Sequence, residues 1–218
     1  MKLIIFDYDD TLARSSDFLY ATDSATATMM GLLPANREQY FALWGLPHEE
    51  MIKVLYPGTN FAEYLTAYEK VYNPVNLKLF DGTKKLIRDL SSIGLMLSIL
   101  TSKRQSFLEQ HMKMNEIDQY FRYLHTAESS IYKKPDPRVF DDTLAHFSVE
   151  PSEALYVGDQ IQDFRAATDR KMNFLAVTTG ITGRNDFIKE GCTTICPDLA
   201  SVGSKIREIV ATTTNIKY

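Results

Sequence analysis

Short runs of apolar residues that stop abruptly at polar residues recur along the chain. The clearest runs cover residues 2–6, 95–100, 154–157 and 174–177, and weaker ones cover residues 123–125 and 193–196. A short continuous apolar run of this kind predicts a strand that is buried on both faces of a parallel sheet. We therefore expect these runs to form the central sheet of the protein.

Stretches with helical periodicity lie between the runs, at residues 83–93, 103–114, 138–147 and 160–171. Asp136 and Pro137 precede the third stretch as N-cap and first helical residue, and Gly94 follows the first stretch. Alternating strands and helices predict an α/β fold, here a Rossmann-like three-layer core with a mostly parallel sheet. Functional groups in such sheets lie just past the carboxyl ends of the strands, where the polar residues follow each run.

One segment interrupts the alternation. Residues 14–79 show no buried-strand pattern and contain four helical stretches, at residues 15–30, 37–44, 48–55 and 61–72. This pattern predicts a small α-helical domain, 14–79, that is inserted into a core formed by residues 1–13 and 80–218. The last residues, 211–218, are polar and are expected to fray.

Composition and charge mainly exclude classes of protein. Hydrophobic residues make up 44% and charged residues 24% of the chain, and the formal net charge is −4. These values are typical of a soluble globular protein and argue against a nucleic-acid partner, which needs a basic face. No run approaches the roughly 20 apolar residues of a membrane span, and no signal-peptide pattern is present, so we expect a cytoplasmic protein without a membrane partner. Cys192 and Cys196 are expected to be partly buried thiols.

Two acidic clusters follow predicted strands. Asp7, Asp9 and Asp10 follow the first run, and Asp159 and Asp163 follow the run at residues 154–157. Neighbouring parallel strands bring both clusters to the same edge of the sheet. Carboxylates so close together repel one another unless a cation or water compensates them, and oxygen ligands without nitrogen or sulfur suit Mg²⁺.

Two further strand-end features suit an anion. Thr101 and Ser102 stand where a helix begins, so that backbone N–H groups and the helix dipole favour negative charge. Lys134 directly precedes Pro135 in a loop stiffened by prolines, which can hold the lysine in one direction. A lysine in such a loop is a candidate phosphate ligand.

Together these features resemble the haloacid dehalogenase-like hydrolase superfamily. Its four motifs occur in the family order, as Asp-Tyr-Asp-Asp-Thr at residues 7–11, Ile-Leu-Thr-Ser at 99–102, Lys-Pro-Asp-Pro at 134–137 and Gly-Asp-Gln-Ile-Gln-Asp at 158–163. Asp10 stands where glycine is commonest, and Lys171 stands in place of a frequent glycine. Aspartate tolerates unusual backbone angles better than most residues, so no loss of activity is expected from Asp10.

The resemblance implies a role for each matching residue. Asp7 would be the nucleophile that forms a transient aspartyl-phosphate, and Asp9 would act as general acid and base. Thr101 and Lys134 would hold the phosphoryl oxygens. Mg²⁺ would bind Asp7, the Asp9 backbone carbonyl and Asp159, with Asp163 in support. The remaining candidates for substrate or phosphate binding are Asp10, Ser102 and His48.

The inserted segment resembles the helical cap of the phosphoglycolate phosphatase and β-phosphoglucomutase branch. Such a cap closes over the site and excludes water. His48 aligns with the cap loop that sets specificity in that branch, although a helix-start surface histidine is an equal alternative. Aromatic residues of the insertion, Trp44 and Tyr68 among them, are expected to form the cap core. The implied activity is Mg²⁺-dependent hydrolysis of a small phosphorylated metabolite, as in phosphoglycolate phosphatase, by a monomer or homodimer.

Other activities remain as alternatives. A phosphosugar mutase of the same superfamily usually carries a histidine early in the cap, and residues 15–34 contain none. A phosphonate hydrolase needs a cap lysine where His48 stands, and a halide-releasing dehalogenase lacks the aspartate found at Asp9. A non-catalytic signalling module also combines acidic residues, a hydroxyl and a lysine around a phosphorylated aspartate. Such modules are shorter, lack a cap and hold the phosphate longer.

Overall fold

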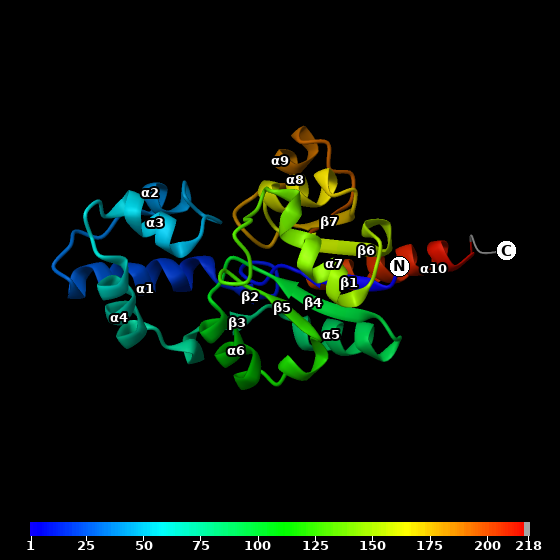
Figure 1. Ribbon diagram of the computed structural model, residues 1–218, viewed down its shortest axis with the longest axis horizontal. Coiled ribbons are helices and arrows are strands. Elements are labelled where there is room, and N and C mark those ends of the chain that lie inside the picture. The colour runs from blue at the N-terminus through cyan, green and yellow to red at the C-terminus, as the bar shows by residue number, and fades with distance from the viewer. Residues whose placement is uncertain (216–218) are drawn as a thin grey trace.

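A six-stranded parallel sheet forms the centre of the computed structural model, which describes residues 1–215 (Figure 1). The sheet order is β5-β4-β1-β6-β7-β8. All six predicted runs are strands: β1 (Leu3–Phe6), β4 (Met96–Leu100), β5 (Tyr123–His125), β6 (Ala154–Gly158), β7 (Asn173–Val177) and β8 (Ile195–Cys196). The first strand therefore lies near the middle of the sheet, between β4 and β6.

Helices cover both faces of the sheet, which confirms the predicted three layers. Alternate side chains of β1 belong to two separate cores, Ile4 and Phe6 to one and Leu3 and Ile5 to the other. All four side chains are fully buried, and each burial stabilises the fold by about 2 kcal/mol. The first core includes residues of α5 (Thr83–Ser92), α6 (Gln105–Met114) and α10 (Leu199–Asn215), and the second includes residues of α7 (Asp141–Phe147) and α8 (Ile161–Asp169).

The inserted segment forms a helical cap beyond one edge of the sheet (Figure 1). It contains α1 (Ser16–Met29), α2 (Arg37–Phe41), α3 (His48–Leu55) and α4 (Phe61–Val71). Its core is mainly aromatic and includes Tyr56, Tyr64, Tyr68 and Tyr72. A short antiparallel ribbon of β2 (Ala13–Arg14) and β3 (Lys78–Leu79) lies where the chain passes between the core and the cap.

Several predicted elements differ in detail. The helix expected from residue 103 begins at Gln105, because the preceding turn places Lys103 in the candidate site. The helix expected at residues 138–147 begins as the 3₁₀ turn η3 (Pro137–Phe140), and α2 ends at Phe41. The sequence pattern does not predict the short strands β2 and β3. It also does not predict the helices α9 (Arg184–Lys189) and α10. The other 3₁₀ turns are η1 (Pro74–Asn76), η2 (Asp118–Tyr120) and η4 (Pro151–Glu153).

The polar C-terminal segment is more ordered than its composition predicts. Residues up to Asn215 continue helix α10, and the rest of the segment expected to fray lies outside the described residues. Within residues 1–215, no helix has both the length and the apolar character needed to cross a membrane. Cys192 and Cys196 are free buried thiols, as predicted.

Candidate active site

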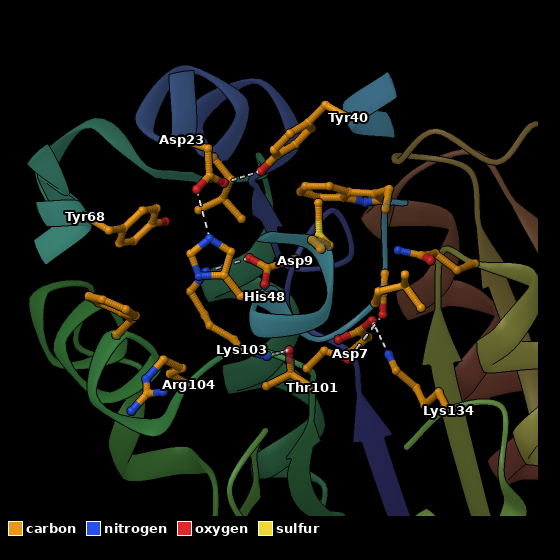
Figure 2. Close-up of a pocket in the computed structure, with 18 residues that line it drawn as sticks. Asp7, Asp9, Asp23, Tyr40, His48, Tyr68, Thr101, Lys103, Arg104 and Lys134 are labelled. Carbon is orange, nitrogen blue, oxygen red and sulfur yellow. Dashed lines mark hydrogen bonds and ion pairs between the residues drawn. The ribbon is translucent and has the colours of Figure 1, made fainter. Parts of the chain in front are cut away.

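The candidate site lies at the carboxyl edge of the sheet, where three neighbouring strands end. Asp7 directly follows β1, Thr101 follows β4 and Asp159 follows β6. Lys134 reaches the same place from the loop between β5 and η3, and Figure 2 shows it beside Asp7. The fold thus brings Asp7 together with three residues that lie more than 90 positions further along the sequence.

Lys134 connects two buried carboxylates. Its Nζ lies 2.7 Å from Asp7 Oδ2 and 2.7 Å from Asp163 Oδ1. The hydroxyl of Tyr156 on β6 lies 3.1 Å from the same Asp163 oxygen. Burial raises the pKa of Asp7 to about 7, against the opposing charge of Lys134. Burial lowers the pKa of Lys134, but the carboxylates of Asp163 and Asp7 outweigh it and raise that pKa above its usual value.

Asp159 is the least compensated charge of the site. Its carboxylate is fully buried and accepts one hydrogen bond, at 2.9 Å from Thr11 Oγ1, while Oδ2 has no hydrogen-bond partner among residues 1–215. Burial, together with the charges of Asp163 and Asp7, raises its pKa well above the usual range. The backbone at Gly180 approaches so closely that an added Cβ would lie 2.0 Å from Oδ2. A group this deeply buried needs a cation to remain charged.

The three carboxylates fit a divalent metal ion. Asp7, Asp159 and Asp163 each place one oxygen within 4.8 Å of the others. Three carboxylates beside one lysine leave an excess of negative charge in a buried place, and the partnerless Asp159 oxygen supplies a free ligand. These are the hard oxygen donors that Mg²⁺ prefers. The side chain of Asp9 is paired with Lys103, so the backbone carbonyl is the part of Asp9 that remains as a predicted metal ligand.

The Asp9 carboxylate is held by a lysine that the sequence analysis overlooks. Lys103 Nζ donates to Asp9 Oδ1 at 2.8 Å, and only 7% of Lys103 is exposed. The Lys103 backbone N–H also donates to Thr101 Oγ1, at 3.2 Å. Burial lowers the pKa of Lys103, but Asp9, Tyr72 and Asp7 together outweigh burial and raise that pKa. Asp9, Thr101 and Lys103 thus form one hydrogen-bonded group at the rim of the site.

The side chain of Asp10 contacts the cap, and Asp10 is not among the residues that line the cavity between cap and core. Its Oδ1 accepts the backbone N–H groups of Ser15 and Ser16, at 2.9 and 3.0 Å, at the start of α1. Its backbone has φ +54°, in the left-handed region that glycine favours and aspartate tolerates. Lys171, the other residue that replaces a glycine, has φ +60°. The Asp10 carboxylate therefore anchors the cap, because its oxygen is used by the first turn of α1.

One contact between the cap and the core is made by a glycine. The Gly45 carbonyl accepts hydrogen bonds from Gln162 Nε2 at 3.0 Å and from Ser102 Oγ at 3.5 Å. Ser102, predicted as a phosphate ligand, lines the cavity but donates to the cap here. Gly45 has φ +95°, and an added Cβ would lie 2.0 Å from Gln162 Nε2. A residue with a Cβ would be strained at this φ and would displace the ends of the Gln160 and Gln162 side chains.

A cavity of about 90 Å³ lies between the cap and the sheet edge. Asp7, Asp9, Thr101, Ser102 and Lys134 line it from the core, and His48 lines it from the cap. Tyr68 belongs to the cap core, as predicted, and also lines the cavity, as does Trp44. Figure 2 shows His48 between Asp23 and the group of Asp9 and Lys103. His48 is the first residue of α3, and its side chain faces the cavity.

Three residues of the site are missing from the sequence analysis. Lys103 follows Thr101 by two positions, and its place in a polar turn beside a predicted anion site is a usable signal. Tyr156 stands inside an apolar run, where its hydroxyl must find a buried partner. Asp23 gives no signal, because a single aspartate in a helix of small and polar residues is usually exposed.

Comparisons with known proteins agree with this geometry. Residues 4–177 match the family model described as haloacid dehalogenase-like hydrolase. PpaX of Clostridium perfringens is 30% identical over 173 residues, which cover 76% of this chain and 78% of PpaX. The phosphoglycolate phosphatase of Nitrosospira multiformis is 26% identical, over 91% of this chain and 92% of that protein. The crystal structure of a predicted phosphoglycolate phosphatase from Haemophilus somnus has a TM-score of 0.83 at 22% identity, over 95% and 98% of the two chains. This last likeness concerns the fold alone.

Proposed function

The chain belongs to the haloacid dehalogenase-like hydrolase family, and on that premise we propose that it is a phosphatase for a small phosphorylated metabolite. The observation that carries the proposal is the charge arrangement around Asp7. Three buried carboxylates, of Asp7, Asp159 and Asp163, converge within 4.8 Å beside a single buried lysine. A divalent cation and a phosphate dianion together would complete this arrangement.

Asp7 is the nucleophile in this proposal. Its carboxylate attacks phosphorus, the bond to the leaving oxygen breaks, and an aspartyl-phosphate forms that water then hydrolyses. Attack by one anion on another is unfavourable, at about 4 kcal/mol for two unit charges 4 Å apart at an effective dielectric of 20. Lys134, at 2.7 Å from Asp7 Oδ2, reduces this repulsion. Mg²⁺ held by Asp7, Asp159 and Asp163, with the Asp9 backbone carbonyl, would neutralise further charge when bound.

Asp9 is the general acid and base in this proposal. It lines the cavity beside Thr101, two residues from the nucleophile. It would protonate the leaving oxygen and then accept a proton from the attacking water. Lys103 holds one of its oxygens, so the other is the one available to the substrate. Thr101 would bind a phosphoryl oxygen together with Lys134.

The cavity supports a small substrate. Its volume is about 90 Å³, and the cap side chains Trp44, His48 and Tyr68 line it. Figure 2 shows His48 and Tyr68 on the side away from Lys134. A relative at 26% identity is named phosphoglycolate phosphatase. We therefore propose phosphoglycolate or a phosphorylated acid of similar size as the first substrate to test.

A phosphate-release assay tests the proposal. The purified chain, with Mg²⁺, is incubated with a panel of phosphate monoesters that includes phosphoglycolate and phosphosugars. We expect release from at least one member, and loss of release in the Asp7→Asn variant. No release from any member, with Asp7→Asn indistinguishable from the wild type, would refute the proposal.

The same reactions discriminate the alternatives. A phosphosugar mutase would convert one sugar phosphate into its isomer with little release of inorganic phosphate. A signalling module would retain label from acetyl phosphate on Asp7 for many minutes without turnover. We expect a short-lived phospho-enzyme and multiple turnovers instead.

A further inference from the structure

A buried carboxylate at the centre of the cap joins all four of its helices. Asp23 on α1 is 2% exposed. Its Oδ2 accepts the hydroxyl of Tyr40 on α2 at 2.6 Å, and its Oδ1 accepts the hydroxyl of Tyr64 on α4 at 2.9 Å. The same Oδ1 lies 2.8 Å from Nε2 of His48 on α3. Three side chains from three other helices thus meet at one carboxylate.

This arrangement fixes the orientation of His48. Because the carboxylate accepts at Nε2, that nitrogen carries the proton and Nδ1 is the free one. The rings of Tyr68 and Phe61 lie against the imidazole, with centroids at 4.8 and 5.7 Å. Among residues 1–215, Nδ1 has no hydrogen-bond partner, and His48 lines the cavity.

The position of His48 indicates that it contacts the leaving group of the substrate. The phosphate end of the cavity is marked by Asp7 and Lys134, which belong to the core. His48 enters from the cap, on the far side of Asp9 in Figure 2. A substrate whose phosphorus faces Asp7 therefore presents its alcohol part to Nδ1.

We propose that Asp23 is a positioning residue that holds His48 so that Nδ1 hydrogen-bonds the leaving group, and that this pair selects phosphomonoesters whose alcohol carries a second polar oxygen. The inference rests on the proposed phosphatase function. A neutral imidazole accepts a hydrogen bond from a hydroxyl through Nδ1, and a protonated one donates to a carboxylate. Both kinds of hydrogen bond would favour a substrate with a second polar oxygen. A leaving group without that oxygen would leave Nδ1 unpaired among aromatic side chains, which is unfavourable.

The experiment compares two substrates in four variants. One substrate is the preferred member of the panel, and the other is methyl phosphate, whose alcohol carries no second oxygen. The selectivity is the ratio of their kcat/KM values. His48→Gln keeps a donor near Nε2 and removes Nδ1, and Asp23→Asn keeps the shape and removes the charge. We expect either change to lower the selectivity about tenfold, mainly through KM of the preferred substrate.

The double variant shows whether Asp23 acts through His48. If it does, Asp23→Asn combined with His48→Gln loses no more selectivity than His48→Gln alone. Tyr20→Phe is the matched control, since Tyr20 also donates a cap hydrogen bond, to the Ala35 carbonyl, but does not line the cavity. Its selectivity should equal that of the wild type. Unchanged selectivity in His48→Gln, or additive losses in the double variant, would overturn the inference while the phosphatase proposal stands.

A second measurement needs no substitution of Asp23. In ¹⁵N spectra of histidine-labelled protein, the His48 ring signals are those absent from His48→Gln. We expect the signal of Nε2 to be that of a protonated nitrogen. The signal of Nδ1 should shift when the product alcohol of the preferred substrate is added, but not when methanol is added. No shift overturns the inference. Wild-type protein that releases phosphate from no substrate overturns the phosphatase proposal and this inference with it.

Discussion

Neutralising Asp7 should stabilise the metal-free protein while it abolishes activity. The Asp7→Asn substitution preserves the shape of the side chain and removes its charge. Asp7 is nearly fully buried, and burial, with the nearby charge of Asp163, raises its pKa from 3.8 to about 7. The folded protein therefore binds this proton more tightly than the unfolded chain does.

The size of the effect follows from proton linkage. Below pH 3.8 the group is protonated in both states, so Asp7 has no charge to bury. As the pH rises from 3.8 towards 7, the unfolded chain releases the proton first, and the free energy of unfolding falls by about 1.4 kcal/mol per pH unit. The full interval amounts to about 4 kcal/mol, which is a large part of the stability of a typical domain. The Asp7→Asn variant avoids this loss, because its amide carries no titratable proton.

Urea unfolding of both proteins, in EDTA and between pH 4.5 and pH 8, measures the difference. We expect Asp7→Asn to be the more stable protein at pH 8, with an advantage that shrinks as the pH falls. Added Mg²⁺ should reduce or reverse the advantage, since the wild type gains the binding energy of the ion and the variant lacks one ligand. Asp169→Asn, at an exposed position, is the matched control and should follow the wild type at every pH. A variant less stable than the wild type at pH 8 in EDTA, or a difference independent of pH, would refute the reasoning.

Three further predictions concern the cap contact, Asp9 and a buried histidine. Gly45→Ala should lower kcat/KM about fivefold, since its Cβ would lie 2.0 Å from Gln162 Nε2, displace that side chain and break the hydrogen bond that it donates to the cap; steady-state assays measure it. Lys103→Met should lower kcat about tenfold or more, because Asp9 loses the ion pair that holds it at 2.8 Å; single-turnover kinetics measure the step. Burial lowers the pKa of His111, so the unfolded chain binds a proton at this residue before the folded protein does as the pH falls below 6.5. The folded protein therefore loses stability in acid. This loss should be absent from His111→Gln, and urea unfolding at pH 7 and pH 5 measures it.

Each of these predictions has a control. Gly58→Ala introduces alanine at φ +84° in open space, so it should reduce stability and leave kcat/KM intact. Lys133→Met, next to Lys134 but outside the main cavity, should not change the chemical step as Lys103→Met does. His146→Gln removes an exposed histidine and should keep the wild-type response to acid. Equal effects of a variant and its control would contradict the corresponding prediction.

Local pattern was sufficient to predict the core of the fold. Each strand of the sheet is a short apolar run because both of its faces are covered, as the alternation of Leu3, Ile4, Ile5 and Phe6 between two cores shows. The residues after the runs, Asp7, Thr101 and Asp159, could be singled out for the same reason. A polar residue at the end of a buried strand must face the sheet edge, where ligands bind.

Tertiary structure alone decided which of these residues meet and how each charge is compensated. Lys103 pairs with Asp9 across 94 positions because β4 lies beside β1, and Lys134 reaches Asp7 across 127 positions from the loop after β5. Nothing local shows that the first turn of α1 uses the carboxylate of Asp10.

The cap depends even more on contacts between distant residues. Asp23, Tyr40 and His48 come from different short helices, and no periodicity marks them as partners. Hydrophobic spacing specifies which residues are buried, but a hydrogen bond or an ion pair also needs the direction of two side chains. That direction is set only when the helices pack.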